Sequence, residues 1–108
     1  GLLERVFYNL LENAIKYSPA GTAIDVAVGT DGECTTVSFA DEGCGVPEEL
    51  RETIFEPFFR IDASRSHLTG GNGLGLALCK KILERHGASI RVLPRTPRGS
   101  IFQVSFPA

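Results

Sequence analysis

Two asparagines that lie one helical turn apart, Asn9 and Asn13, are the first residues of the chain whose types and spacing suit chemistry. Side chains four positions apart share one face of a helix, so both carboxamides can face the same point. Mg²⁺ prefers hard oxygen ligands, which makes Asn13 the better candidate metal ligand and Asn9 a second. Lys16 and Tyr17 follow, where a cation and a hydroxyl could contact phosphate oxygens. The alternative, a solvent-exposed polar helix face, is the more common explanation for such a pair alone.

A second segment, Asp41-Glu42-Gly43-Cys44-Gly45, directly follows a predicted strand. A carboxylate at a strand end can accept a hydrogen bond from an exocyclic amine such as that of adenine. Gly43 and Gly45 allow the backbone to approach a flat base closely or to adopt a positive φ. A plain turn at the end of a strand explains the same residues, and for this segment alone it is the favoured explanation.

A third segment holds four glycines between Gly70 and Gly75 and opens a predicted helix. Unpaired N–H groups at a helix N-terminus, with glycines in front of them, form an anion site. The segment is not a Walker loop, because no Gly-Lys-Ser/Thr is present. It also differs from the dinucleotide fingerprint, because no strand precedes it. A single glycine loop is weak evidence for a phosphate site.

An aromatic segment, Phe55-Glu56-Pro57-Phe58-Phe59, leads into residues that show no sustained periodicity as far as residue 72. A loop of this length is commonly a functional lid or disordered. The aromatic rings could anchor the loop on the core, and ordinary core packing would explain at least one of them. Arg60 and Arg65 flank the first half of the loop. Either guanidinium could stabilise charge on a transferred terminal phosphate, so both are candidate catalytic residues.

The elements that position these segments follow from hydrophobic periodicity and from turn residues. We expect helices over residues 2–17, about 47–54 and 73–86, and strands over 23–29, 34–40, 89–94 and 100–106. Pro19 ends the first helix and Gly87 follows the last. The residues of the last helix expected to face inward are Leu74, Leu78 and Ile82, with Cys79 a further candidate. This order predicts one α+β domain over residues 1–108, a two-layer α/β sandwich with a mixed, mostly antiparallel sheet and three helices on one face.

Composition narrows the possible partners. The chain has 108 residues and a net charge of −2, which argues against nucleic-acid binding because there is no basic field to displace counterions. Three cysteines, an odd number, fit a reducing compartment. The sequence has no run of about 18 apolar residues, and it starts inside a helical pattern. We therefore expect a monomeric cytoplasmic domain of a longer protein, and the sequence leaves open whether that protein is anchored in the inner membrane.

Together and in this order, these segments resemble the ATP-binding catalytic domain of sensor histidine kinases, whose superfamily includes DNA gyrase, the ninety-kilodalton heat-shock chaperone and MutL. Residues 9–18 match the asparagine box of that family and residues 41–45 its first glycine box. Residues 55–59 match its phenylalanine box and residues 71–76 its second glycine box. The resemblance covers essentially the whole chain. It implies a Bergerat-type fold with three helices and five strands, so we expect one family strand to lie N-terminal to Gly1.

The resemblance also implies roles for single residues. Asp41 would bind the adenine amino group, and Asn13 would bind Mg²⁺ with Asn9 nearby. The residues implied in contacts with ribose or phosphates are Lys16, Tyr17, Arg60 and Arg65. The glycine-box residues implied in nucleotide binding are Gly43, Gly45, Val46, Gly71, Asn72, Gly73, Leu74 and Gly75. Cys44 stands where the family usually has proline and Asn72 where threonine is common, and neither change removes an indispensable group.

One position separates histidine kinases from the ATPases and serine kinases of this superfamily. Its hydrolytic members and its serine kinases carry a general-base glutamate four residues before the metal-binding asparagine, whereas this chain has Asn9 there. An amide cannot take a proton at neutral pH, and Glu12 lies about 100° around the helix from Asn13. Neither His67 nor His86 has the sequence context of an acceptor histidine. The resemblance therefore implies transfer of phosphate from Mg·ATP to a histidine on a separate dimerisation domain, for relay to a response regulator. The alternative is a nucleotide-binding regulatory module without turnover.

Overall fold

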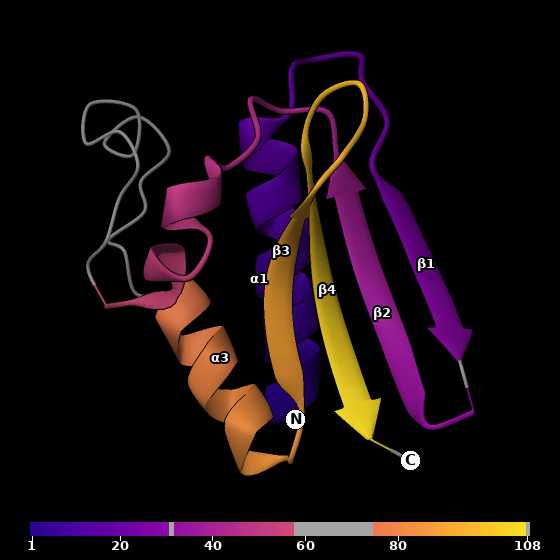
Figure 1. Ribbon diagram of the computed structural model, residues 1–108, viewed down its shortest axis with the longest axis vertical. Coiled ribbons are helices and arrows are strands. Elements are labelled where there is room, and N and C mark those ends of the chain that lie inside the picture. Colours follow the sequence, from indigo (N-terminus) through magenta and orange to yellow (C-terminus); the bar gives the residue numbers. More distant parts are fainter. Residues whose placement is uncertain (31, 58–74, 108) are drawn as a thin grey trace.

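The computed structural model describes residues 1–30, 32–57 and 75–107, which form two layers (Figure 1). The first layer is a sheet, and the second is helical. The chain order is α1 (Leu2–Tyr17), β1 (Asp25–Thr30), β2 (Cys34–Asp41), η1 (Glu48–Leu50), η2 (Thr53–Phe55), α3 (Gly75–Arg85), β3 (Ser89–Pro94) and β4 (Ser100–Pro107). Among the described helices, none is long and apolar enough to cross a membrane. The α+β sandwich expected from the sequence is confirmed.

The sheet has the strand order β1-β2-β4-β3. Every pairing among the described strands is antiparallel, in line with the mostly antiparallel sheet that was expected. Asp41, the last residue of β2, pairs with Ser100, the first residue of β4. The end of β2, the end of β3 and the starts of β1 and β4 therefore meet at the edge of the sheet that is uppermost in Figure 1. Helix α1 also ends near this edge, which brings its last turn toward the loop after β2.

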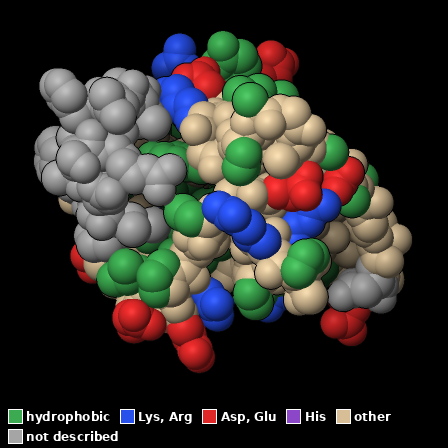
Figure 2. All heavy atoms as spheres, turned by 90° about the horizontal axis from the view of Figure 1, so that it is seen from above, with side chains coloured by type: hydrophobic (Ala, Val, Ile, Leu, Met, Phe, Trp, Pro, Cys, Tyr) green, Lys and Arg blue, Asp and Glu red, His purple; other side chains and the backbone are tan. Residues whose placement is uncertain are grey.

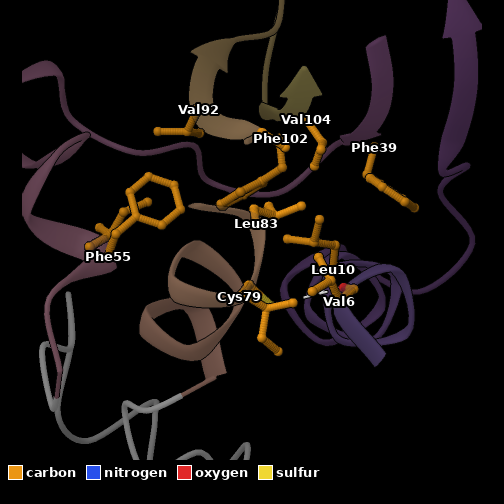
Figure 3. Packing of buried hydrophobic residues seen from close by; sticks show 12 residues of the cluster. Val6, Leu10, Phe39, Phe55, Cys79, Leu83, Val92, Phe102 and Val104 are labelled. Carbon is orange, nitrogen blue, oxygen red and sulfur yellow. Dashed lines mark hydrogen bonds between the residues drawn. The ribbon is translucent and has the colours of Figure 1, made fainter. Parts of the chain in front are cut away.

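The core lies between the helices and one face of the sheet. Its fully buried side chains are Leu10, Leu83, Val6, Val104 and Cys79. Figure 3 shows the helical members facing Phe39 and Phe102 of the sheet. Phe55 of η2 packs edge-to-face on Phe102 at a centroid distance of 6.4 Å. Each buried Leu or Phe contributes about 1.5–3 kcal/mol relative to its exposed state, so this core holds α1 and α3 in place.

Helix α1 has the bounds that its apolar periodicity predicts. Val6, Leu10 and Ala14 are buried, and they recur at steps of four along one face. The helix ends at Ser18, whose backbone is extended with ψ 141°, as expected for a residue before proline. Its N–H still closes the last turn on the carbonyl of Ala14 at 3.1 Å. Local sequence is therefore sufficient to define this element.

Two local expectations need correction. The segment expected as one helix over about 47–54 forms two short 3₁₀ helices, because Pro47 and Pro57 bound it closely and Pro57 holds Glu56 extended at ψ 145°. In α3, Leu78 was expected to face inward but is 45% exposed, whereas Leu83 is fully buried. The burial of Cys79 against α1 turns Leu78 to the edge of the packed face. The expected Leu74 lies outside the described residues.

Strand β1 has no buried residue. Val26 and Val28 share one side, as the alternation predicted, and they pair with Phe39 and Val37 of β2. They therefore lie on the helix-covered face of the sheet. They remain 53% and 70% exposed. Alternation in the sequence identified the strand and its sides, and only the packing shows that the helices leave this edge uncovered.

Candidate functional site

The carboxylate of Asp41 lies inside the protein although it ends a strand. The residue is 3% exposed and follows Phe39 by two positions, so both side chains face the helical layer. Its Oδ1 accepts a hydrogen bond from the backbone N–H of Gly43 at 2.9 Å. No other hydrogen bond to this carboxylate comes from residues 1–30, 32–57 or 75–107. A buried carboxylate with remaining acceptor capacity can accept from an exocyclic amine.

The loop after Asp41 packs tightly against the end of α1. A Cβ at Gly43 would come within 2.5 Å of the Tyr17 carbonyl oxygen, so no other residue fits there without movement. The Glu42 N–H donates to Ser18 Oγ at 3.3 Å, and Glu42 Oε2 accepts from the Ala23 N–H at 2.9 Å. The structure thus brings the asparagine helix and the first glycine box together. Gly43 is required here by the neighbouring backbone.

The connection between β3 and β4 also supports this loop. Gly99 has φ +116°, and a Cβ there would come within 1.9 Å of the Asp41 carbonyl oxygen. Arg98 Nε donates to the Gly43 carbonyl at 3.1 Å. Arg51 Nε donates to the Val46 carbonyl at 3.3 Å. Sequence reasoning missed these supporting residues. The one available signal was the glycine before β4, which marks a close approach but does not name the partner.

Helix α1 carries the candidate metal and phosphate residues on a less constrained surface. Asn13 is half-buried, and it makes no hydrogen bond with any residue in the described part of the chain. Lys16 Nζ lies 3.2 Å from Glu12 Oε1, and both side chains are more than a third exposed. Such an exposed pair contributes at most about 1 kcal/mol, which leaves the ammonium able to exchange its partner for a phosphate. Tyr17 is 37% exposed.

Asn9 is held more firmly than Asn13. Its Nδ2 lies 3.9 Å from Cys79 Sγ of α3. Asn9 also lines a shallow surface groove of about 630 Å³ together with Tyr8 of α1 and Leu78 of α3. Its other lining residues, Gly1, Glu4 and Arg5, lie in the first turns of α1, so the groove extends from Asn9 toward the start of that helix.

The donor set fits a magnesium ion that is shared with phosphates. Within the described ranges, no group of three or more His, Cys, Asp or Glu side chains is placed to hold a metal. Mg²⁺ commonly keeps several waters and takes only one or two protein oxygens besides substrate phosphates. The carboxamide of Asn13, which no described residue hydrogen-bonds, can supply such an oxygen. Figure 2 shows charged side chains of both signs at the strand-end edge, so this surface is not a uniformly basic patch.

Several predicted site residues lie outside the described residues. They are Phe58, Phe59, Arg60, Arg65, Gly71, Asn72, Gly73 and Leu74, and the histidine His67 lies there as well. Gly75, the last of the second glycine box, is exposed and is the first residue of α3. Phe55, which opens the phenylalanine box, is a buried core residue. His86 contacts the Ile82 carbonyl through Nδ1 at 2.8 Å, at the end of α3.

The fold defines the class of protein, an α+β sandwich of the kind found in histidine kinase catalytic domains. A family model described as "Histidine kinase-, DNA gyrase B-, and HSP90-like ATPase" matches residues 1–108. The chain belongs to this family, as its four sequence boxes indicated, and the family implies ATP binding.

Relatives and solved structures agree with this assignment. The chain is 41% identical over 107 residues to the sensor-like histidine kinase SenX3 of Mycolicibacterium smegmatis. The aligned region covers 99% of this chain and 28% of SenX3. A mycobacterial sensor histidine kinase, MprB, superposes with a TM-score of 0.85 at 32% identity, over 98% of this chain and 70% of that one. The histidine kinase ThkA, solved in complex with the response regulator TrrA, matches with a TM-score of 0.78 at 32% identity. The match covers 97% of this chain and 28% of the ThkA chain. This chain thus spans little more than a quarter of the full-length SenX3 that it matches.

Proposed function

We propose that this domain binds Mg·ATP and transfers the γ-phosphate to a histidine on a separate dimerisation domain of its parent protein. The phosphoryl group then passes to an aspartate of a response regulator, a partner class seen with the relative ThkA. The domain works on the cytoplasmic side, where ATP is available. The acceptor histidine is not one of the two histidines of this chain, because His86 is engaged at a helix end and His67 lacks the sequence context of an acceptor.

The observation that carries the proposal is the chemistry of the asparagine face. A hydrolase of this superfamily needs a base where this chain has Asn9, and an amide cannot accept a proton at neutral pH. The nearest acid on the helix, Glu12, is paired with Lys16 at 3.2 Å. A neutral imidazole is already a nucleophile and needs no such base. The face is therefore suited to phosphotransfer to histidine and poorly suited to activating water.

In this proposal, different residues bind different parts of the nucleotide. Asp41 accepts from the adenine amino group while Gly43, Gly45 and Val46 lie against the base. Lys16 and Tyr17 contact ribose or phosphate oxygens. Asn13 supplies an oxygen to the magnesium ion, which neutralises phosphate charge when it is bound. The residues proposed for the phosphates that lie beyond the described ranges are Arg60, Arg65, Gly71, Asn72, Gly73 and Leu74. Gly75, the last glycine of the same box, is the first residue of α3.

Reconstituted phosphotransfer tests the proposal. The chain is mixed with the histidine-bearing helical domain of its parent protein and γ-labelled ATP, and label on that domain is followed under acid and alkaline conditions. We expect alkali-stable, acid-labile phosphohistidine. An acceptor domain with its histidine changed to alanine is the control and should remain unlabelled. Tight Mg·ATP binding without labelled histidine would contradict the kinase proposal and favour the regulatory-module alternative.

A further inference from the structure

Cys79 lies between α3 and α1 with its side chain fully buried. Its sulfur is 3.9 Å from Asn9 Nδ2 and 3.9 Å from the Val6 carbonyl oxygen. Figure 3 shows the thiol of α3 beside Val6 of α1, with the contact to the carbonyl drawn as a dashed line. One buried atom on the last helix therefore contacts both the backbone and a functional side chain of the first.

The thiol can satisfy both contacts in one way only. It has a single proton to donate, and its sulfur accepts weakly. The Val6 carbonyl can only accept, so the S–H points to it and the sulfur accepts from Asn9. The Asn9 carboxamide consequently turns its nitrogen to the helix interface.

The oxygen of the same carboxamide has no hydrogen-bond partner among residues 1–30, 32–57 and 75–107. In the described part of the chain no hydrogen bond reaches Asn9 Oδ1, and Asn9 lines the groove between α1 and α3. A flipped amide would place Oδ1 against a sulfur whose proton is already donated, and would lose the N–H···S contact. Packing of a small apolar residue explains why Cys79 is buried, but it does not explain why a polar amide donates to it.

We propose that Cys79 is a positioning residue that holds the nitrogen of the Asn9 carboxamide in the α1–α3 interface, so that the carbonyl oxygen is turned away from the interface and can take part in the metal–phosphate site of the bound nucleotide. This inference rests on the proposed function, because it assigns Asn9 to that site. It adds a residue from the last helix to the machinery of the first. The contact also links the two helices that flank the groove.

The first test follows the Asn9 side-chain amide by NMR in the nucleotide-free chain. We expect its protons to exchange with solvent about tenfold more slowly than those of Asn13, which has no partner among the described residues and serves as an internal control. Cys79→Val, which removes the acceptor, should abolish the difference. Cys79→Ser, which restores a donor and an acceptor, should retain most of it. An Asn9 amide unchanged by Cys79→Val would overturn the proposal.

The second test measures the Mg²⁺ concentration that half-saturates ATP binding. Cys79→Val should raise this Mg²⁺ concentration about threefold to tenfold. The effect is small for a residue that orients a metal ligand, because N–H···S bonds are weak. The same substitution in an Asn9→Ala background should have no further effect. Leu83→Val, a packing change on the same helix face, should lower the melting temperature without changing the Mg²⁺ requirement.

The outcomes separate the two proposals. An equal effect of Cys79→Val with and without Asn9, or an Mg²⁺ requirement that follows only the melting temperature, overturns the positioning role. Failure of the wild-type chain to bind Mg·ATP overturns the proposed function instead, and the amide exchange measurement would still report whether the thiol orients Asn9.

Discussion

The two ends of the candidate site are built in different ways. The loop at residues 41–45 is held by close backbone contacts from two other segments, with Tyr17 on one side and Gly99 on the other. The face of α1 presents Asn13 without a described partner and Lys16 in an exposed ion pair. The end proposed to bind the base is therefore shaped by the protein backbone itself. The end proposed for metal and phosphate instead presents side chains that could change partners when a ligand binds. The two ends should respond differently to substitution.

The largest effect is expected from a substitution that disrupts the loop at residues 41–45. Gly99→Ala places a Cβ against the Asp41 carbonyl at a φ of +116°, and it should lower the free energy of unfolding by about 3 kcal/mol. Gly21→Ala is the matched control, since Gly21 also has a positive φ but open space around it, and it should cost only about 1 kcal/mol. Urea unfolding of both variants measures the difference. Equal costs would show that the close approach contributes nothing.

The next largest effect tests the base contact. Asp41→Asn keeps an acceptor for the Gly43 N–H, but it removes the charge that would accept from adenine. We expect ATP affinity to fall about 30-fold, as for loss of a charged hydrogen bond worth about 2 kcal/mol. Inosine triphosphate, which lacks the amino group, should lose little affinity. Calorimetry with both nucleotides checks this, and Asp25→Asn, an exposed carboxylate paired with Arg95, should change neither.

An intermediate effect is expected at the end of the site proposed for metal and phosphate. Asn13→Ala removes the proposed metal ligand without removing any hydrogen bond found in the described residues. The Mg²⁺ concentration that half-saturates ATP binding should rise about tenfold, while the free energy of unfolding changes by less than about 0.5 kcal/mol. Titration of Mg²⁺ at fixed ATP and a parallel urea curve separate the two quantities. A stability loss equal to that of Gly99→Ala would contradict the contrast between the two ends.

The smallest expected effect concerns the support of the loop by a side chain. Arg98→Ala removes the hydrogen bond of 3.1 Å to the Gly43 carbonyl. ATP affinity should fall about fivefold, since one such bond contributes about 1 kcal/mol. Arg91→Ala removes a similar bond of 2.9 Å to Gln103 on the exposed face of β3 and β4, and should leave affinity unchanged. Equal affinities in both variants would show that the close backbone contacts hold the loop without Arg98.

The sequence by itself determined most of the elements and named the residues that are proposed to bind the nucleotide. Three local properties could be recognised without knowledge of the fold. They are the periodicity of α1, the alternation of the strands and the position of Gly87 after the last helix. The asparagine and glycine boxes named Asn13 and Asp41 in the same way. Local patterns work here because each depends on residues a few positions apart, whose preferences do not require knowledge of distant partners.

Only the tertiary structure decided what surrounds those residues. The Gly43–Tyr17, Gly99–Asp41 and Cys79–Asn9 contacts join residues 26, 58 and 70 positions apart along the sequence. The tertiary structure also decided that Leu78 is turned outward, because the packing of α3 on α1 imposes that orientation. Such contacts depend on how layers stack, and neither propensity nor periodicity encodes a partner on another element. The sequence therefore named the groups that would meet a nucleotide, and the packing of helices on the sheet determined which of them are held in place.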